Sequence, residues 1–362
     1  MGRTQTTIAF VETGLQALNL VEYQAATGDL ADLVVIPVDP GNGSSEQALD
    51  VLRFFGVRLP IYRQQWHGGW LKPGRNAESA LDELLALASR VAPVGRLILG
   101  EYRLPLNWTF ARALDLTGAD IVVVDDGTAT LRINRVDGIT GDDMPGPASG
   151  LPYAPLDGVT FFSSYADALH ASPHDTVIEN RREMLRSRYA DLPADESVVF
   201  VMGSPLVESG IMAGGDIDIA LALVDEARRW RPNAMVAYVP HRRESPAKRR
   251  TLGHYCDVID FARPYELVPP QVGRLPSHYV GTFSSLFGNL ASLAPDRLHL
   301  RAYRIPEQAI SPQHRAGVAR CYDDLAQPGI DVHMIDPADA ATSGAARNAQ
   351  AAQWEAEEER CE

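Results

Sequence analysis

The sequence has very few lysines, only three cysteines and no long apolar run. Lys72 and Lys248 are its only lysines, so arginine carries almost all of the positive charge. The cysteines, at positions 256, 321 and 361, form no CxxC pair and show no metal-ligand spacing. We therefore expect neither a disulfide framework nor a cysteine-based metal site, and a reducing cytoplasm fits this composition.

Hydrophobic segments of membrane-spanning length are also missing. No stretch approaches the roughly 20 apolar residues that a transmembrane helix requires. The first ten residues carry one arginine and no apolar run, which is not the pattern of a signal peptide. We expect a cytoplasmic protein that is at most peripheral, at the inner face of the membrane.

Positive charge is in deficit as well. The 362 residues carry a formal net charge of -14, which disfavours a nucleic acid or an anionic membrane held by a broad basic surface. An anionic ligand would need a local positive site. The length leaves room for two globular domains.

The first half of the chain alternates apolar runs with helical patterns. Strands are expected at residues 6–11, 33–38, 96–99, 120–124 and 159–162, and helices at residues 15–24, 44–56, 78–91 and 107–116. Gly28 is a plausible C-cap, and Ser44 or Ser45 can serve as an N-cap. Residues 137–158, rich in Gly, Pro and Asp, read as a loop. This alternation predicts a parallel sheet covered by helices on both faces.

The pattern restarts after a charged helix expected at residues 177–189 and a polar break. Further strands are expected at residues 197–202, 234–239, 258–261, 278–282 and 298–303. The sequence therefore predicts an α/β protein with two facing Rossmann-like domains, residues 1–190 and 191–336, and a cleft between them. Residues 337–362 read as a polar tail or loose helix.

Ligands of open α/β sheets bind at the carboxyl ends of strands, so residues that follow strands are the first candidates for a site. Asp125 and Asp126 follow the apolar run 121–124, and Gly127 permits a sharp turn. Adjacent carboxylates raise one another's pKa, which suits a general base for a sugar hydroxyl. A solvated Asp-Gly turn is the alternative interpretation.

A histidine flanked by arginines closes the run 234–239. His241 with Arg242 and Arg243 is a combination that holds a phosphate, and a bound phosphate favours the protonated histidine, which can donate a proton as the leaving group departs. The alternative is a basic surface turn that leads into a charged helix around residues 247–250.

Two further motifs offer neutral donors. Ser284 and Ser285 stand between a strand and a helix, where hydroxyl and backbone N–H groups form an anion site, or where serine simply caps the helix. Gly203 and Ser204 follow the run 197–202, and the glycine permits close approach of a nucleotide or an acceptor.

In this order and spacing, residues 125–127, 240–244 and 284–285 resemble the bacterial sialyltransferases and polysialyltransferases of GT-B fold. Those families carry an acidic-acidic-Gly motif, a His-Pro motif and a Ser-Ser or Ser-Thr motif. Residues 161–165, and Pro264 with Glu266, are also similar. Arg242 stands where the family usually has proline, which leaves the local backbone turn open.

The resemblance implies an inverting, metal-independent transfer of sialic acid, or a related nonulosonic acid, from a CMP donor to a glycan hydroxyl, with no further cofactor. By position, Asp125 is the favoured base and Asp126 the reserve. His241 would protonate or hydrogen-bond the CMP phosphate. The remaining donor-binding candidates are Gly203, Ser204, Arg242, Glu266, Ser284 and Ser285.

Three other functions fit parts of the pattern. A sugar-nucleotide epimerase shares the two-domain architecture but needs a UDP-sugar and acid/base groups on both sides of the sugar C2. A CDP-linked glycerol or ribitol phosphotransferase would use a related nucleotide. A binding module without activity is disfavoured by the acid pair and the histidine. The sequence leaves the acceptor, the linkage and the choice between single and polymerising transfer open.

Overall fold

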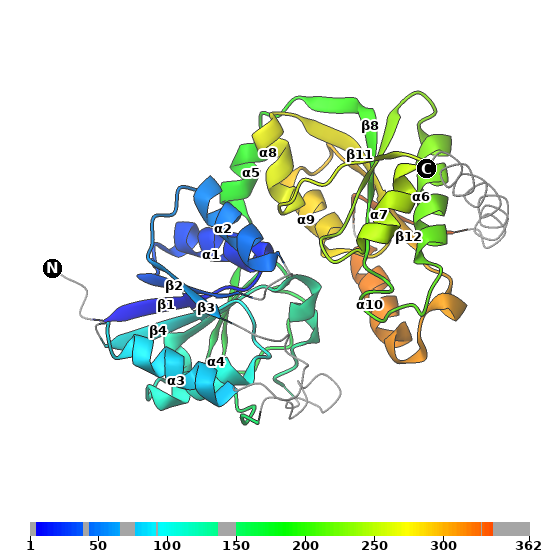
Figure 1. Ribbon diagram of the computed structural model, residues 1–362. Helices are drawn as coiled ribbons and strands as arrows, with labels where there is room; N and C mark the ends of the chain where they lie inside the picture. The colour runs from blue at the N-terminus through cyan, green and yellow to red at the C-terminus, as the bar shows by residue number, and fades with distance from the viewer. Residues whose placement is uncertain are drawn as a thin grey trace, which may run out of the picture. The chain divides into compact units, whose positions relative to one another are not determined.

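The computed structural model describes residues 5–38, 43–65, 77–91, 93–136, 150–326 and 328–335. The chain forms two compact units that divide between Ser187 and Arg188, where the sequence suggested a boundary after residue 190. Each unit is a parallel sheet with helices on both faces (Figure 1). The tail expected from residue 337 lies outside the described residues.

Unit 1 holds a seven-stranded sheet in the order β3-β2-β1-β4-β5-β6-β7. The strands are β1 Thr6–Phe10, β2 Leu33–Val38, β3 Ile61–Gln65, β4 Val94–Leu99, β5 Ile121–Val124, β6 Thr160–Ser163 and β7 Thr176–Glu179. Helices α1 (Gly14–Thr27) and α2 (Ser44–Phe54) cover one face, and α3 (Ala77–Ala88) and α4 (Pro105–Ala113) the other (Figure 1). The strand order reverses between β1 and β4, and open α/β sheets generally bind ligands at such a reversal.

The core of unit 1 is built from the apolar strands and from aromatic side chains of α4. Trp108 is fully buried and packs edge-on against Tyr102, whose carbonyl oxygen accepts its indole N–H at 2.6 Å. Phe110 packs edge-on against Phe10 of β1. Each such side chain contributes about 1.5–3 kcal/mol by leaving water, so α4 is held firmly against the ends of β1 and β4.

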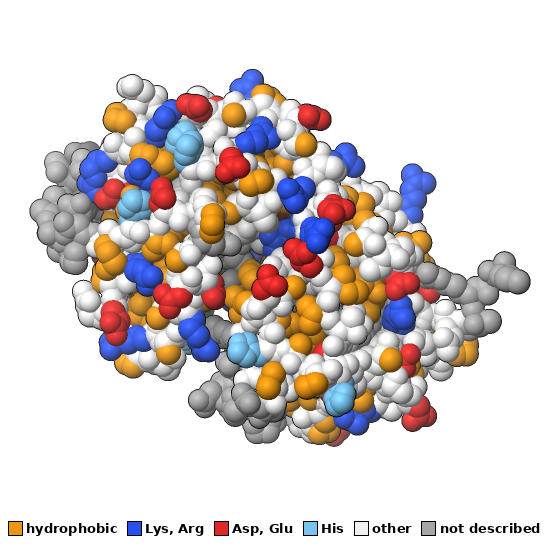
Figure 2. All heavy atoms as spheres, turned by 180° about the vertical axis from the view of Figure 1, so that it is seen from behind, with side chains coloured by type: hydrophobic (Ala, Val, Ile, Leu, Met, Phe, Trp, Pro, Cys, Tyr) orange, Lys and Arg blue, Asp and Glu red, His pale blue; other side chains and the backbone are white. Residues whose placement is uncertain are grey.

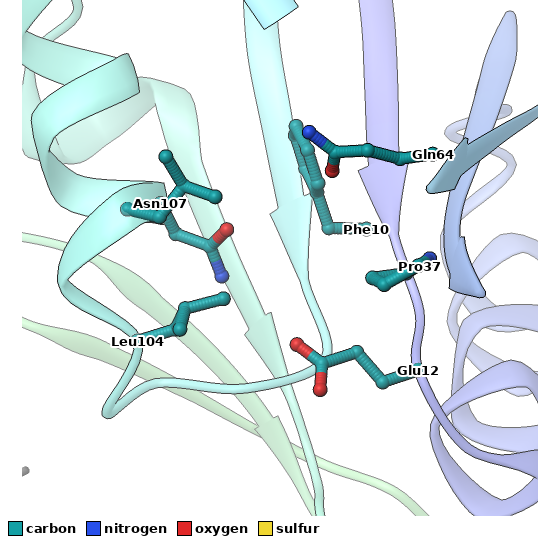
Figure 3. A pocket seen from close by; sticks show the side chains of 7 residues that line it. Phe10, Glu12, Pro37, Gln64, Leu104 and Asn107 are labelled. Carbon is teal, nitrogen blue, oxygen red and sulfur yellow. The ribbon is translucent and has the colours of Figure 1, made fainter. Parts of the chain in front are cut away.

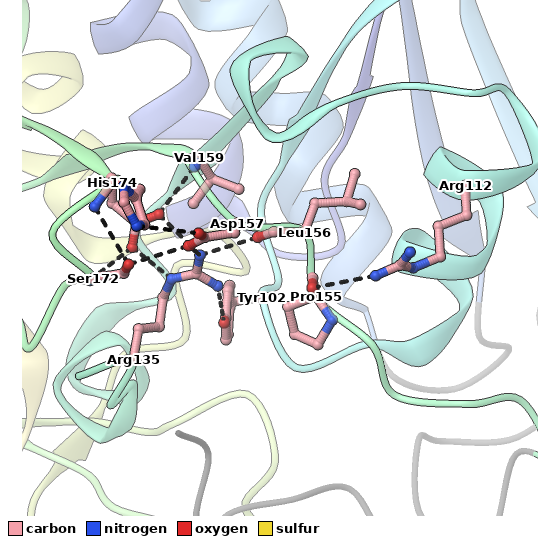
Figure 4. Close-up of polar contacts among 10 residues, drawn as sticks. Tyr102, Arg112, Arg135, Pro155, Leu156, Asp157, Val159, Ser172 and His174 are labelled. Carbon is pink, nitrogen blue, oxygen red and sulfur yellow. Dashed lines mark hydrogen bonds and ion pairs between the residues drawn. The ribbon is translucent and has the colours of Figure 1, made fainter. Parts of the chain in front are cut away.

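A buried arginine ties the loops of unit 1 together (Figure 4). The guanidinium of Arg135 donates to the carboxylate of Asp175 at 2.6 and 2.8 Å, to the Tyr102 hydroxyl at 2.7 Å and to the Leu156 carbonyl at 3.0 Å. Its side chain is only 7% exposed, so the loss of Asp175 would leave this buried charge with only the exposed Asp157, at 3.5 Å, as an ion-pair partner. The network fixes the segments that lead into β6 and β7.

Unit 2 holds a six-stranded sheet in the order β10-β9-β8-β11-β12-β13. The strands are β8 Ala194–Met202, β9 Met235–Val239, β10 Asp257–Val258, β11 Leu275–Gly281, β12 His299–Arg304 and β13 Ile330–Met334. The helices are α6 Asp216–Trp230, α7 Pro246–Gly253, α8 Val268–Val272, α9 Ser285–Leu293 and α10 Arg315–Leu325. Here the strand order reverses between β8 and β11.

Two predictions of local structure need correction. Residues 177–189 are not one helix, because β7 pairs in parallel with β6 and is followed by a separate helix, α5, at Glu183–Tyr189. The β-branched run Thr176, Val177 and Ile178 favours the strand. The N-cap of α2 is Gly43 rather than Ser44 or Ser45, whereas the left-handed C-cap expected at Gly28 is confirmed at φ 75°.

On the face seen in Figure 2, acidic and basic side chains alternate without a wide field of one sign. Among the described residues, no helix is both long and apolar enough to span a bilayer.

Candidate functional site

Asp125 follows β5 and is an internal side chain, only 1% exposed. Its Oδ2 accepts the backbone N–H and the hydroxyl of Ser164 at 2.7 and 2.9 Å, and its own carbonyl accepts the amide of Asn19 at 3.0 Å. Burial raises the pKa of Asp125, while the Ser164 hydrogen bonds and the charge of Arg182 oppose the rise. Asp125 therefore joins the end of β5 to the loop after β6.

Asp126 has different surroundings. Its carboxylate is 25% exposed, accepts the amide of Gln16 at 2.9 Å and lies 3.9 Å from the guanidinium of Arg103. Burial and then the charge of Glu101 raise the pKa of Asp126 well above its usual range. An accessible carboxylate with a raised pKa is suited to take a proton from a hydroxyl.

Glu101 completes a carboxylate pair with Asp126. It follows β4, is 3% exposed, and is held by Arg103 through two hydrogen bonds of 3.0 and 2.9 Å. The negative charge of Glu101 disfavours ionisation of Asp126, whereas the guanidinium of Arg103 partly offsets this effect.

Gln16 on α1 positions this pair. Its amide oxygen accepts the backbone N–H of Glu12 at 2.7 Å while its nitrogen donates to Asp126. Gly100 makes room for it, since a Cβ there would lie 2.5 Å from the Gln16 amide oxygen. The sequence analysis missed Gln16, Glu101 and Arg103. Glu101 directly follows a strand, so the rule that found Asp126 could have found it as well.

In unit 2, candidate motifs end three neighbouring strands, β9, β8 and β11. Ser204 follows β8 and Thr282 follows β11, and their hydroxyl oxygens are 2.8 Å apart. This contact spans the point where the strand order reverses. The structure thus brings the Gly203–Ser204 loop beside the segment that leads to Ser284.

His241 follows β9 and is partly buried. Its Nδ1 accepts the backbone N–H of Arg243 at 3.1 Å, so the proton of the neutral ring sits on Nε2. Burial, followed by the charges of Arg242, Arg243 and nearby cations, lowers the pKa of His241 to about 3. Burial and positive neighbours thus favour the neutral ring in the ligand-free chain, and the protonated His241 expected with a bound phosphate stays a prediction. A neutral Nε2–H remains as a hydrogen-bond donor.

The two serines after β11 differ in role. Ser284 is the N-cap of α9, and its hydroxyl oxygen accepts the N–H of Leu286 at 3.2 Å, which leaves the hydroxyl proton to donate elsewhere. Ser285 is the first residue of α9, where backbone N–H groups have no partner within the helix. Glu266 is 8% exposed and accepts the amide of Asn289 on α9 at 2.7 Å.

A buried ion cluster supports the Gly203–Ser204 loop. The Lys248 ammonium, 3% exposed, donates to Glu244 at 2.9 Å, to Asp216 at 2.8 Å and to the Ser204 carbonyl at 3.0 Å. Tyr238 donates to Glu244 at 2.8 Å. Gly203 packs closely against this cluster, since a Cβ there would lie 2.8 Å from the Glu244 carboxylate, so charge and close packing both fix the loop.

No protein-family model and no curated protein sequence matches the chain. Solved structures with a similar fold include S. aureus MnaA with UDP (TM-score 0.55, 12% identity, 94% of this chain and 87% of that one). A proposed UDP-N-acetylglucosamine 2-epimerase from Listeria monocytogenes has a TM-score of 0.50 and 12% identity, and the match covers 79% of this chain and 76% of that one. An α/β-galactoside α-2,3-sialyltransferase from Photobacterium phosphoreum is also similar, with a TM-score of 0.47 and 10% identity, and the match covers 91% of this chain and 99% of that one. The predicted fold class is confirmed as a two-domain α/β fold of the GT-B type.

Proposed function

We propose that this chain is an inverting, metal-independent glycosyltransferase that moves sialic acid, or a related nonulosonic acid, from a CMP donor to a glycan hydroxyl. One observation carries the proposal. Neutral donors and arginines gather at the ends of three adjacent strands in unit 2, while unit 1 presents one accessible carboxylate of raised pKa. A phosphate-holding domain and a base-bearing domain are the two parts that such a transfer needs.

Asp126 is the base in this proposal, and Asp125 organises its loop. As the acceptor oxygen attacks the anomeric carbon, Asp126 takes the hydroxyl proton. The bond from that carbon to the phosphate oxygen breaks, and its electron pair leaves with CMP. Asp125 is unsuited to this step because it is buried and its Oδ2 is held by Ser164.

The departing CMP carries additional negative charge on a phosphate oxygen, which the residues of unit 2 are suited to stabilise. His241 offers its neutral Nε2–H, Ser284 its hydroxyl proton, and Ser285 a backbone N–H at the start of α9. Arg242 supplies positive charge in the same loop as His241. Because the histidine acts as a hydrogen-bond donor in its neutral form, this contact persists above neutral pH.

An epimerase is the second candidate. The Glu101–Asp126 pair is an acid/base set that proton removal at a sugar C2 would also use. An epimerase requires a UDP-sugar, and it releases no free nucleotide when the reaction only inverts the configuration at C2. A CDP-alditol phosphotransferase would release CMP but would place a phosphodiester in the product. The nucleotide that is used and the product that is formed therefore distinguish the sialyltransferase, the epimerase and the phosphotransferase.

Nucleotide selectivity tests the proposal. At about 100 times its dissociation constant, a ligand that binds only the folded state adds about 2.7 kcal/mol of stability. We expect CMP to raise the melting temperature, and UDP to have little effect. The shift should shrink in His241→Ala and persist in His254→Ala, a matched histidine at the exposed end of α7. A larger shift with UDP than with CMP would favour the epimerase instead.

A further inference from the structure

The carboxyl edge of the unit 1 sheet leaves only a small space where β1 and β4 part (Figure 3). Phe10, Glu12, Gln64 and Asn107 are among the residues that line it. It has room for about one water and not for a sugar ring. A ligand of that size is therefore recognised by side chains at open strand ends, and the orientation of those side chains decides what they can bind.

In unit 2, the backbone turn that presents His241 is held by an arginine of α7. The carbonyl oxygen of His241 accepts the backbone N–H of Glu244 at 2.9 Å, which closes a four-residue β-turn. Nη2 of Arg249 donates to the carbonyl oxygens of His241 and Arg242, both at 3.3 Å. One guanidinium nitrogen therefore binds two successive carbonyls of the turn.

The other side of this guanidinium is anchored to the segment after β10. Nη1 of Arg249 donates to Oδ2 of Asp260 at 2.5 Å, and only 26% of the Arg249 side chain is exposed. Oδ1 of Asp260 accepts the backbone N–H of Ala262 at 2.8 Å, and Ala262 has a φ of 52°. A residue with a Cβ is strained in this left-handed region, and such strain persists only where the surroundings hold it. The Arg249–Asp260 pair thus joins the end of β10 to the turn after β9.

The contact with Arg242 reaches the imidazole through one peptide bond. The carbonyl of Arg242 and the N–H of Arg243 belong to the same trans peptide, which is planar, so the two groups point in opposite directions. The carbonyl is bound by Arg249, and the N–H donates to Nδ1 of His241 at 3.1 Å. By holding one end of this plane, the guanidinium determines which ring nitrogen carries the proton.

A flipped peptide would reverse the chemistry of His241. The carbonyl of Arg242 would then face Nδ1, which would carry the proton, and Nε2 would become an acceptor with no proton to offer a phosphate oxygen. The flipped turn also needs a positive φ at Arg243, which a residue with a Cβ resists and glycine does not. Arg249 and the Cβ of Arg243 therefore both oppose the flip.

We propose that Arg249, anchored by Asp260, is a positioning residue that keeps His241 in its Nε2–H form and so makes it a hydrogen-bond donor. The inference rests on the proposed function for the identity of the ligand, whereas the protonated nitrogen is a property of the free chain. Arg249 acts through the backbone and needs no contact with the ligand.

Nitrogen-15 NMR of the histidine-labelled full chain, above neutral pH and without ligand, tests the proposal. We expect the Nε2–H form in the wild type and in Arg243→Gly, where Arg249 still holds the peptide. Adding Arg249→Gln to Arg243→Gly should raise the ratio of the Nδ1–H to the Nε2–H form about tenfold or more, because charge-assisted hydrogen bonds are lost. Adding Arg250→Gln instead is the matched control, since Arg250 is the next residue of α7 and is exposed, and it should leave the ratio unchanged.

CMP binding tests the consequence for the ligand. Calorimetry should show about tenfold weaker binding of CMP to Arg249→Gln, because His241 no longer holds its donor in place. Binding to Arg250→Gln should be unchanged, although the same charge is removed from the adjacent position.

The outcomes separate the two proposals. An Nε2–H form that persists with Arg243→Gly and Arg249→Gln together, or an equal change with Arg250→Gln, overturns the inference even if CMP binds. A change that depends on Arg249 supports it even if the wild type binds no CMP, and in that case only the proposed donor fails. If the double variant does not fold, amide exchange in Arg249→Gln decides: exchange of the Arg243 N–H about tenfold faster than in Arg250→Gln supports the inference, and equal exchange overturns it.

Discussion

Asp125 and Asp126 are adjacent after β5, but their carboxylates have different surroundings. Successive side chains at a strand end point to opposite sides, so Asp125 enters the interior and Asp126 meets Gln16 and the Glu101 carboxylate. Because Asp125 is the more buried of the two, the proposed function takes Asp126 as the base, whereas the family resemblance favoured Asp125. Adjacent residues with such unlike surroundings should respond differently to the same substitution.

Replacing each aspartate by asparagine separates these roles. Asp126→Asn should lower turnover by about a hundredfold or more, with CMP binding unchanged, because the base contacts the acceptor. Asp125→Asn should mainly lower the free energy of unfolding, by about 1–3 kcal/mol, since it disturbs the buried contacts with Ser164. Steady-state kinetics and denaturant unfolding give both values. A folded but inactive Asp125→Asn beside an active Asp126→Asn would exchange the roles.

The pH dependence of kcat/KM tests the carboxylate pair. A base works when deprotonated, so activity should rise with pH through the raised pKa of Asp126. Glu101→Gln removes a negative neighbour and releases Arg103 towards Asp126. Both changes lower the pKa of Asp126, and the acid limb should move to lower pH. An acid limb that stays in place would show that Glu101 does not set this pKa.

At the scale of elements, the sequence predicted most of the strands whose side chains are buried on both faces. Strands β1, β2, β5 and β9 are near-continuous apolar runs, and their positions were found to within a residue or two. The polar edge strands β3 and β13 were missed, because one side of each faces no further strand and their sequences lack an apolar run.

The residues of the candidate site also fall into two groups, those that the local sequence reveals and those that only the fold brings together. The motifs that follow strands could be read locally, since strand ends are visible in the sequence. Gln16 could not, because its partner Asp126 is 110 positions away and only the sheet brings α1 beside the end of β5. The lowered pKa of His241 depends first on burial, which no local pattern contains, although the arginines beside it are visible in the sequence.

Gly203, in the loop after β8, provides a prediction about the packing of this loop rather than about a reacting group. A Cβ on Gly203 would lie 2.7 Å from the Tyr238 hydroxyl and 2.8 Å from the Glu244 carboxylate, both buried. Gly203→Ala should therefore cost about 1–3 kcal/mol of unfolding free energy and weaken CMP binding. Gly214→Ala is the matched control, because nothing lies within 4 Å of its Cβ. Equal effects of the two substitutions would contradict the close packing above the ion cluster.

At the scale of the whole molecule, two Rossmann-like units each have a reversal of strand order, and each reversal carries a different set of groups. Unit 1 places a carboxylate pair near the ends of β4 and β5. Unit 2 places hydroxyls, a neutral histidine and arginines near the ends of β8, β9 and β11. A chain with proton-accepting groups in one unit and phosphate-binding groups in the other is suited to transfer between an alcohol and a nucleotide-activated sugar.

The most direct test is release of CMP from CMP-sialic acid by the purified chain in the presence of EDTA, with and without lactose. We expect CMP release that depends on lactose, yields a sialylated product of inverted anomeric configuration, and falls about a hundredfold or more in Asp126→Asn. Activity that disappears with EDTA and returns with magnesium would contradict the metal-independent base mechanism. Failure to use CMP-sialic acid, together with epimerisation of a UDP-sugar, would contradict the account as a whole.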